Sequence, residues 1–168
     1  MSKKPNKILE LKKIARNVSR FSNGSFGMCL YLSAILANEI NTKTKLEAKV
    51  AVGSFGLFEK LIFVYHPIND VIDIALNSNE TKTLNWDGHA WVEVKGLIID
   101  PSIVSSFSVA YPGAIIDNIL KDASNGEEFL FDSSHNLSKK GLRYFKEDEL
   151  SSTSINYFLK ISERIMAS

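Results

Sequence analysis

The sequence predicts an α+β domain in which N-terminal helices pack on an antiparallel β-sheet. Two observations predict this class: helical periodicity fills most of the first 40 residues, and short stretches rich in β-branched and aromatic residues follow from about residue 48. The chain has 168 residues, of which 45% are hydrophobic and 23% charged, a composition typical of one compact domain. We therefore expect one domain over residues 1–168.

A basic amphipathic helix is predicted within residues 1–22. Apolar residues recur there at helical spacing, at Ile8, Leu11, Ile14 or Ala15, Val18 and Phe21. Lysine and arginine outnumber acidic residues in this segment, whereas the formal net charge of the whole chain is only +1. Because charged faces of surface helices are usually solvated, we expect the basic face to lie in solvent and not on an anionic partner.

The second predicted helix begins at or near Cys29 and ends around Asn41. It follows a turn at Asn23-Gly24 and is apolar on nearly all sides, which predicts a buried position at the centre of the domain. Cys29 is the only cysteine of the chain. In the first turn of a helix, unpaired N–H groups and the positive end of the helix dipole stabilise a thiolate. Cys29 is therefore a candidate nucleophile.

Strands are predicted after residue 45. Residues 48–53 form the first strand, closed by a glycine, and residues 61–65 form the second, stopped by Pro67. Residues 71–76 are either a third strand or a short helix, and the polar residues 77–87 are a loop. The sheet therefore follows the two helices along the chain.

A β-hairpin is predicted over residues 89–101. Two runs rich in β-branched and aromatic residues flank Lys95-Gly96, which fits a two-residue turn. The facing pairs are then Val94 with Leu97, Glu93 with Ile98, Val92 with Ile99 and Trp91 with Asp100. Because side chains alternate between the faces of a strand, one face carries His89, Trp91, Glu93 and Asp100. His89 and Asp100 become diagonal neighbours, with backbones roughly 7–8 Å apart and side chains within hydrogen-bond reach.

These residues form a set that is able to attack an amide. Cys29 is the expected nucleophile, His89 the general base and then acid, and Asp100 the group that orients the imidazole. Attack would give a thioester after loss of the amine, with the oxyanion held by the backbone N–H of Cys29 and a second donor just upstream. Asn23 is the first candidate for that second donor, and Ser25 is the next.

The order of these blocks resembles the transglutaminase-like superfamily of cysteine enzymes, and in particular its short bacterial members. The blocks are Gly27-Met28-Cys29 before an apolar helix, the strand at 48–53, the run His89-Ala90-Trp91-Val92-Glu93-Val94, and Asp100-Pro101. The likeness extends from about residue 27 to residue 102, under half of the chain. It implies a papain-like fold, with the cysteine at the start of a helix and the histidine and aspartate on an antiparallel sheet. By this resemblance, Cys29, His89 and Asp100 are the catalytic triad.

The resemblance implies a cysteine-dependent amide hydrolase or acyltransferase that acts on a peptide or protein. The acceptor decides the reaction: water on a main-chain thioester gives proteolysis, water on a glutamine-derived thioester gives deamidation, and an amine gives transamidation. The sequence leaves these three reactions open. A reading from a different class is a non-catalytic protein-binding module that keeps the fold and its cleft. Trp91 is expected in the core or in the wall of the cleft, where it is the candidate substrate-binding residue.

Other kinds of site have no support in the sequence. One cysteine and three scattered histidines give no zinc-type ligand spacing, and residues 53–56 lack the lysine and threonine of a phosphate loop, so we expect no metal and no cofactor. His66 and His135 lie in predicted loops and are expected at the surface. The near-neutral charge argues against a nucleic-acid partner, and no apolar run approaches the length of a membrane span. One cysteine and no signal sequence favour a cytoplasmic protein, or one secreted by a non-classical route.

Residues 105–168 are predicted to cover the catalytic core at residues 23–104. A short helix is expected within 109–121, an edge strand at 128–131 and a helix over 154–166. Core packing is the expected role of three aromatic residues in this part: Tyr111, Phe131 and Tyr144.

Overall fold

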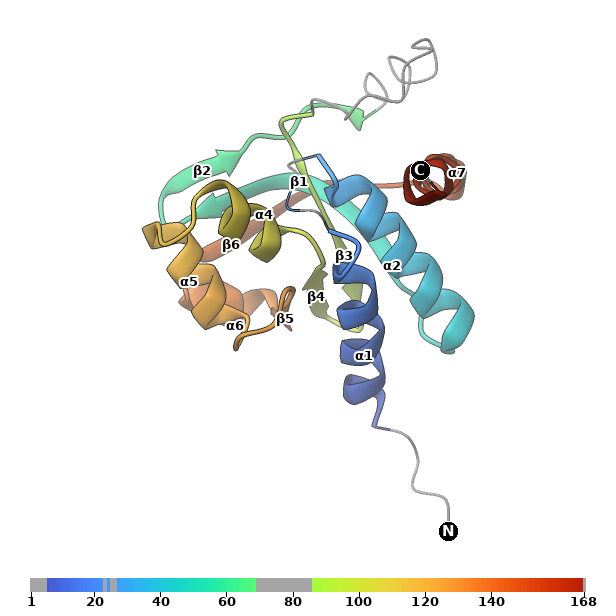
Figure 1. The fold of residues 1–168 in the computed structure, drawn as a ribbon, viewed down its shortest axis with the longest axis horizontal. Coiled ribbons are helices and arrows are strands. Elements are labelled where there is room, and N and C mark those ends of the chain that lie inside the picture. The colour runs from blue at the N-terminus through green and yellow to red at the C-terminus, as the bar shows by residue number, and fades with distance from the viewer. Residues whose placement is uncertain (1–5, 23, 25–26, 69–85, 168) are drawn as a thin grey trace.

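The computed structural model shows an α+β fold with an antiparallel sheet, as the sequence predicts (Figure 1). It describes residues 6–22, 24, 27–68 and 86–167, of which 164–167 are described by their backbone alone. The elements before residue 101 are α1 (Lys7–Ser19), α2 (Cys29–Lys43), β1 (Lys49–Leu57), β2 (Lys60–Phe63), β3 (His89–Val94) and β4 (Leu97–Asp100). Those after it are α4 (Ile103–Ala110), α5 (Ile115–Ala123), β5 (Leu130–Ser133), α6 (Ser134–Lys139), β6 (Leu142–Glu149) and α7 (Ser152–Ala167).

Strand β1 is the centre of a six-stranded sheet in which every pair is antiparallel. Strand β6 runs along one edge of β1, and β3 and then β2 share the other edge. β1 continues past Gly53, where the sequence predicted its end, because a bulge lies there. A Cβ at Gly53 would lie 1.9 Å from the carbonyl oxygen of Phe145 on β6. The glycine therefore permits the close approach of β6 and does not end the strand.

Strand β2 is a short edge strand. It begins one residue earlier than predicted and ends at Phe63, two residues earlier than predicted. The element predicted at residues 71–76 and the loop residues 77–85 lie outside the described residues.

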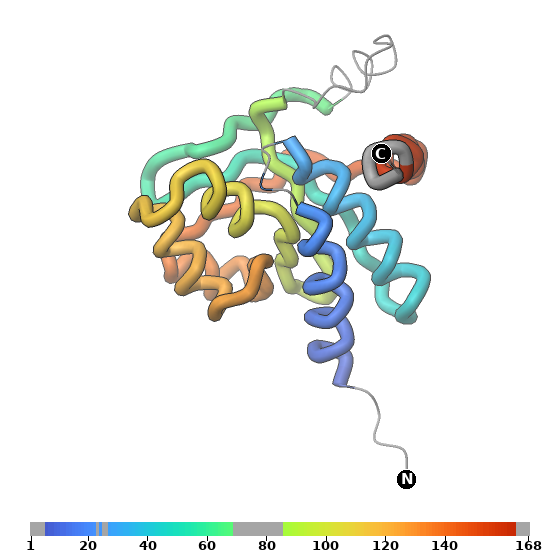
Figure 2. Tube along the Cα trace, viewed as in Figure 1, coloured from blue at the N-terminus to red at the C-terminus, as the bar shows by residue number. Residues whose placement is uncertain are grey.

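The sheet has a hydrophobic core on each face. On one face, α1, α2 and α7 cover residues that include Val50, Val52, Ala90 and Val92. On the other, α4 and α5 cover residues that include Ala51, Phe55, Trp91 and Ile98. The two groups of helices lie on opposite sides of the view in Figures 1 and 2. Because side chains alternate along a strand, His89 belongs to the face of Trp91, and Asp100 to the face of Ile98, which is the same face.

The two N-terminal helices pack as the sequence predicts. α2 lies between α1, β3 and α7, and it is buried on most of its circumference. α1 buries the stripe Leu11, Ile14, Ala15 and Val18. Ile8 and Phe21 were expected on the same stripe but are exposed, because Ile8 lies in the first turn of α1 and Phe21 lies beyond its last residue.

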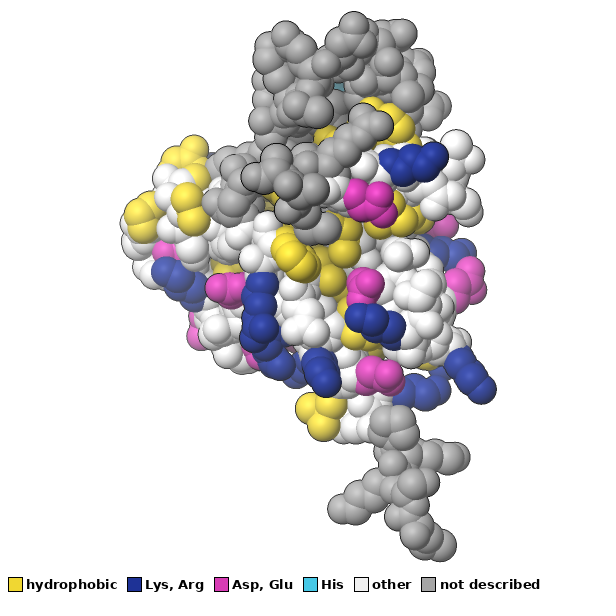
Figure 3. Space-filling view, turned by 45° about the vertical axis from the view of Figure 1, so that its right-hand side comes forward, with side chains coloured by type: hydrophobic (Ala, Val, Ile, Leu, Met, Phe, Trp, Pro, Cys, Tyr) yellow, Lys and Arg dark blue, Asp and Glu magenta, His cyan; other side chains and the backbone are white. Residues whose placement is uncertain are grey.

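Most basic side chains of the α1 segment are exposed, whereas Lys12 is half-buried, with its Nζ 5.3 Å from the centre of the Phe131 ring. Lys13, Arg16 and Arg20 are all exposed. The Arg16 guanidinium donates to both carboxylate oxygens of Glu127, with N–O distances of 2.5 and 3.1 Å. On the face shown in Figure 3, basic and acidic side chains alternate without a large area of one sign.

The C-terminal part contains more structure than the sequence predicts. α5 is the short helix expected within 109–121 and ends two residues beyond that range, whereas α4, which ends at Ala110 before the turn at Pro112-Gly113, was not predicted. β5 and α7 lie within two residues of their predicted bounds. α6 and β6 were not predicted. β6 ends in the charged, exposed residues 146–149, so its sequence lacks the apolar alternation of a strand.

Ser33 of α2 is fully buried, and its hydroxyl has no hydrogen-bond partner among the described residues. We expect Ser33→Ala to raise the free energy of unfolding by about 1 kcal/mol, since it removes a desolvated hydroxyl and introduces a better helix former. The melting temperature should rise by roughly 2–4 °C for a chain of this size. Scanning calorimetry measures this change. A fall in melting temperature would mean that the hydroxyl is bonded in solution.

Candidate active site

Three candidate residues stand at the ends of their elements. Cys29 is the first residue of α2, His89 is the first residue of β3, and Asp100 is the last residue of β4. The β3–β4 hairpin has the predicted register, with Val92 opposite Ile99. Lys95 and Gly96 both have positive φ, at 51° and 74°, which is the conformation of a two-residue type I′ turn. This turn fixes the register that brings His89 toward Asp100.

His89 and Asp100 form a direct, buried contact. The distance between His89 Nε2 and Asp100 Oδ2 is 2.5 Å, and the two residues are 3% and 0% exposed. The Cys29 side chain lines the same cavity as the His89 imidazole, and its interaction with the imidazole helps to raise the pKa of His89. Since Nε2 is bonded to Asp100, Nδ1 is the imidazole nitrogen left for Cys29. The three residues therefore form a continuous row from thiol to imidazole to carboxylate.

Electrostatics favour a charged His89–Asp100 pair. Burial alone would lower the pKa of His89, but the Asp100 charge, together with the hydrogen bonds to Asp100 and Cys29, raises this pKa to about 10. Burial alone would raise the pKa of Asp100, but the His89 charge and the hydrogen bonds from its neighbours lower it below its usual range. At neutral pH the imidazole is therefore protonated and the carboxylate ionised.

The Asp100 carboxylate has a donor on every side. Oδ1 accepts from the backbone N–H groups of Ser102 and Ile103, both at 3.2 Å, and from the Ser102 hydroxyl at 3.3 Å. Oδ2 accepts from the Tyr144 hydroxyl at 2.8 Å in addition to His89. Burial and the Asp100 charge raise the pKa of Tyr144 well above its usual range, so its hydroxyl remains a donor. These bonds fix the carboxylate in place and keep it ionised.

Aromatic rings surround the His89 imidazole. The Phe63 ring stacks on it, with centroids 5.2 Å apart and planes at 17°, and the Trp91 ring lies 6.2 Å away at 27°. Phe55 and Tyr144 lie within 5.8 and 6.2 Å of the imidazole centroid. The rings limit rotation of the imidazole and exclude water from its faces, so the imidazole stays aligned with both partners.

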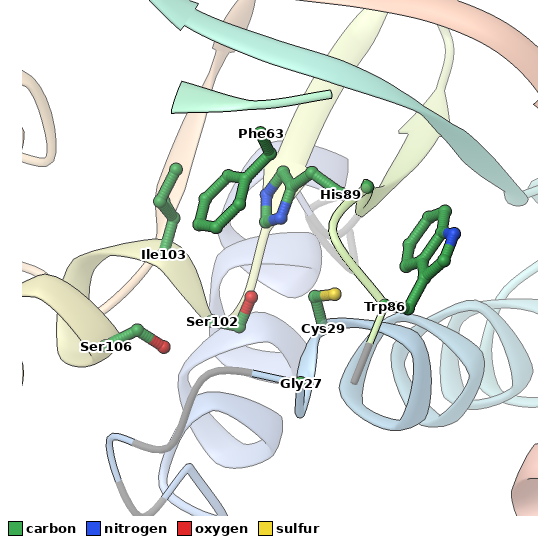
Figure 4. A pocket seen from close by; sticks show the side chains of 9 residues that line it. Gly27, Cys29, Phe63, Trp86, His89, Ser102, Ile103 and Ser106 are labelled. Atoms are coloured by element: carbon green, nitrogen blue, oxygen red, sulfur yellow. The ribbon is translucent and has the colours of Figure 1, made fainter. Parts of the chain in front are cut away.

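A small cavity opens beside Cys29 and His89 (Figure 4). It provides about 40 Å³ of space for the centres of water molecules. The residues that line it are Gly27, Cys29, Phe63, Trp86, Gly88, His89, Ser102, Ile103 and Ser106. Cys29 lines this cavity and is 7% exposed.

Trp86 is a wall of the cavity that the sequence did not identify. Its Nε1–H donates to the carbonyl oxygen of His66 at 3.0 Å, and the residue is 8% exposed. A Cβ on Gly88 would lie 2.3 Å from the Trp86 ring, so the ring packs directly on the Gly88 backbone. Trp86 therefore supplies an apolar wall, because its only donor group is already bonded.

The structure brings together three of the site residues predicted from the sequence and does not describe two others. Cys29, His89 and Asp100 lie together as expected. Asn23 and Ser25, the candidates for the second oxyanion donor, lie outside the described residues.

The expectation that Trp91 contacts substrate needs correction. Trp91 has no exposed surface and does not line the cavity. It shares the face of His89, as predicted, but lies two residues further into the sheet, where the Tyr144 ring packs on it with centroids 4.9 Å apart. Its Nε1–H donates to Glu93 at 3.2 Å. Trp91 thus packs beside His89 in the core and does not line the cavity.

Tyr144 is a further site residue that the sequence did not identify. The core packing expected of this residue is present, but its hydroxyl also bonds Asp100. The one available signal was a short strand-like alternation over four residues: Leu142 and Tyr144 point inward, and Arg143 and Phe145 point outward. His66 and His135 are exposed, as expected.

The described residues contain no group of three or more His, Cys, Asp or Glu side chains placed to hold a metal ion. Among the same residues, no helix combines the length and the hydropathy needed to cross a membrane.

Comparisons with known proteins do not assign a family. No family model matches the chain, and no curated protein matches it significantly. The crystal structure of a genomics target aligns with 98% of this chain and 74% of its own, at 13% sequence identity and a TM-score of 0.46. At that TM-score the likeness supports no conclusion about fold family or function.

Proposed function

We propose that this chain is a cysteine-dependent amide hydrolase or acyltransferase that acts on a peptide or protein, with a papain-like fold of the transglutaminase-like type. The observation that supports it is the buried row Cys29–His89–Asp100, which ends at a cavity. Each member has the chemistry that nucleophilic catalysis on an amide needs: a thiol, a base and a group that orients the base. The position of Cys29 at the start of α2, with the other two residues on an antiparallel sheet, fits the arrangement that the resemblance implies.

The proposed acylation uses the three residues in turn. In the resting site the proton of the Cys29 thiol already lies on His89 Nδ1, and the imidazolium stabilises the thiolate beside it. Cys29 Sγ attacks the amide carbon, so that the S–C bond forms and the carbonyl oxygen becomes an oxyanion. The first-turn N–H groups of α2 point toward that position. The C–N bond then breaks, and the amine leaves with the proton of His89.

Deacylation returns the site to its starting state. Water or an amine enters, loses a proton to His89 Nδ1 and attacks the thioester carbon, and the C–S bond breaks with return of the thiol. Asp100 stays ionised throughout and holds the imidazole in one orientation. Proteolysis, deamidation and transamidation differ only in the acyl donor and acceptor, so the same three residues would serve each reaction.

The test is to trap the acyl-enzyme. We expect p-nitrophenyl acetate to release one burst equivalent of p-nitrophenol and to leave an acetyl group on Cys29, detected by mass spectrometry of the peptide that contains it. Cys29→Ser is the matched control and should show neither. Glutamine-containing peptides are then assayed for released ammonia, new N-termini and incorporated amine, which separates the three reactions. If Cys29 is not acetylated, the catalytic proposal fails and the cavity should be studied as part of a non-catalytic binding module.

Tyr144→Phe should weaken the site without removing any triad member. The variant loses a hydrogen bond to an ionised group, which is worth about 1.5–3 kcal/mol of stability. We expect the free energy of unfolding in urea to fall by roughly 2 kcal/mol and the acylation burst to slow. In an Asp100→Asn background the same change should have a much smaller effect, because the charged acceptor is already absent. Equal effects in the two backgrounds would show that Tyr144 acts only through packing.

A further inference from the structure

Ser106 of α4 is the cavity residue whose role the triad does not explain. Four serines lie on or next to this helix, and three have bonded hydroxyls. The Ser102 hydroxyl donates to Asp100, the Ser105 hydroxyl bonds Ser22 at 2.6 Å, and the Ser108 hydroxyl donates to Asp117 at 2.7 Å. The Ser106 hydroxyl has no hydrogen bond to any described residue, although Ser106 is only 4% exposed.

The free hydroxyl of Ser106 is in contact with the cavity. Ser106 lines the same cavity as Cys29 and His89. Figure 4 shows Ser102 and Ser106 on α4 at one side of this cavity and Trp86 at the other, with Cys29 and His89 between them.

The size of the cavity limits what it holds. The cavity offers about 40 Å³ to the centres of water molecules, which is room for a small group of a few heavy atoms. A carboxamide is a group of this kind. Phe63, Ile103 and Trp86 supply apolar walls.

We propose that Ser106 is a substrate-binding residue whose hydroxyl hydrogen-bonds the carboxamide of the acyl donor in this cavity. This inference rests on the proposed function. A hydroxyl both donates and accepts, so it satisfies a carboxamide through either its C=O or its N–H. Phe63, Trp86 and Ile103 are apolar, and the side chains of His89 and Ser102 are already bonded to Asp100, so the Ser106 hydroxyl favours an amide over a hydrocarbon of equal size.

Two small thiol reagents test the assignment. Iodoacetamide has a carboxamide: the Cys29 Sγ–C bond forms, the C–I bond breaks, and iodide leaves with the electron pair. Methyl methanethiosulfonate transfers an apolar methylthio group: an S–S bond forms, and methanesulfinate leaves. The ratio of the two second-order rate constants at Cys29 reports recognition of the carboxamide. We expect Ser106→Ala to lower this ratio about tenfold, entirely through the iodoacetamide rate.

Matched variants exclude indirect effects. Ser33→Ala also deletes a buried serine hydroxyl, but one that does not line the cavity, and should leave the ratio unchanged. Ser106→Thr keeps the hydroxyl and should keep the ratio even if its extra methyl slows both reagents. A ratio in Ser106→Ala within twofold of wild type, or an equal fall of both rate constants, overturns the assignment while the proposed function stands. Wild-type protein inert to both reagents overturns the proposed function, and this inference with it.

Discussion

His89→Ala is expected to slow alkylation of Cys29 by iodoacetamide at pH 6.5 by roughly one hundredfold. In the wild type, a His89 pKa of about 10 keeps the imidazole protonated beside the sulfur, where its charge stabilises the thiolate. Without that charge the thiolate loses the partner that stabilises it, so the reactive form of Cys29 becomes scarce at pH 6.5. Quenched time courses, measured by mass spectrometry between pH 5.5 and 9, give the rates.

The shape of the pH profile separates this effect from a general loss of structure. Wild-type protein should keep most of its rate between pH 8.5 and 6.5, whereas His89→Ala should lose about tenfold for each pH unit. His135→Ala, an exposed histidine on α6, is the matched control and should follow the wild type. Parallel profiles for wild type and His89→Ala would contradict the proposed pairing of His89 with Cys29.

Asp100→Asn should cause the largest loss of stability among single substitutions in the site. It leaves a buried imidazolium without its partner charge, and breaking a buried pair costs about 3–5 kcal/mol. His89 has a raised pKa in the folded state. Its contribution to the free energy of unfolding is therefore complete below about pH 6.5 and is lost as the pH rises toward 10. Asp100 has a lowered pKa, so its contribution is complete above about pH 3.9 and is lost as the pH falls through the lowered value.

The pH dependence of urea unfolding tests this prediction. Between pH 6 and 9.5 the wild type should lose stability, because the histidine releases its proton in the unfolded chain while His89 keeps it in the folded chain, and Asp100→Asn should lack that slope. The difference between the two proteins is therefore largest near pH 5–6 and smaller at pH 9.5. Asp122→Asn removes an exposed carboxylate of α5 and should leave both values unchanged. If Asp100→Asn had the same free energy of unfolding as Asp122→Asn at every pH, the His89–Asp100 ion pair would be ruled out.

The triad was predictable because each of its members depends on local sequence. The helix that begins at Cys29 is defined by its own apolar run, and the His89–Asp100 contact follows from one two-residue turn and strict alternation along two short strands. Such patterns extend over about 15 residues or fewer, whereas the meeting of Cys29 with His89 was expected only from the chemistry and the family resemblance.

The remaining site residues depend on contacts between distant parts of the chain. Tyr144 reaches Asp100 across a separation of 44 residues, from a strand whose charged sequence hides its pairing with β1. Alternation along the strand predicted the correct face of the sheet for Trp91. It did not predict that Trp91 is fully buried, which follows from the packing of Tyr144 of β6 on its ring. Trp86 and Ser106 line the cavity because of where the segment before β3 and the helix after β4 pack, and neither position has a local signature.

The contacts of helix α4 determine how the site is lost when the protein unfolds locally. Its first turn bonds Asp100 through Ser102 and Ile103, Ser105 bonds the Ser22 hydroxyl just before the loop that leads to Cys29, and Ser106 lines the cavity. A fluctuation that detaches this eight-residue helix would release all of these together. Loss of the site by local opening is therefore expected to be all-or-none, with amides of α4 and of the Asp100 turn exchanging hydrogen as one cooperative unit.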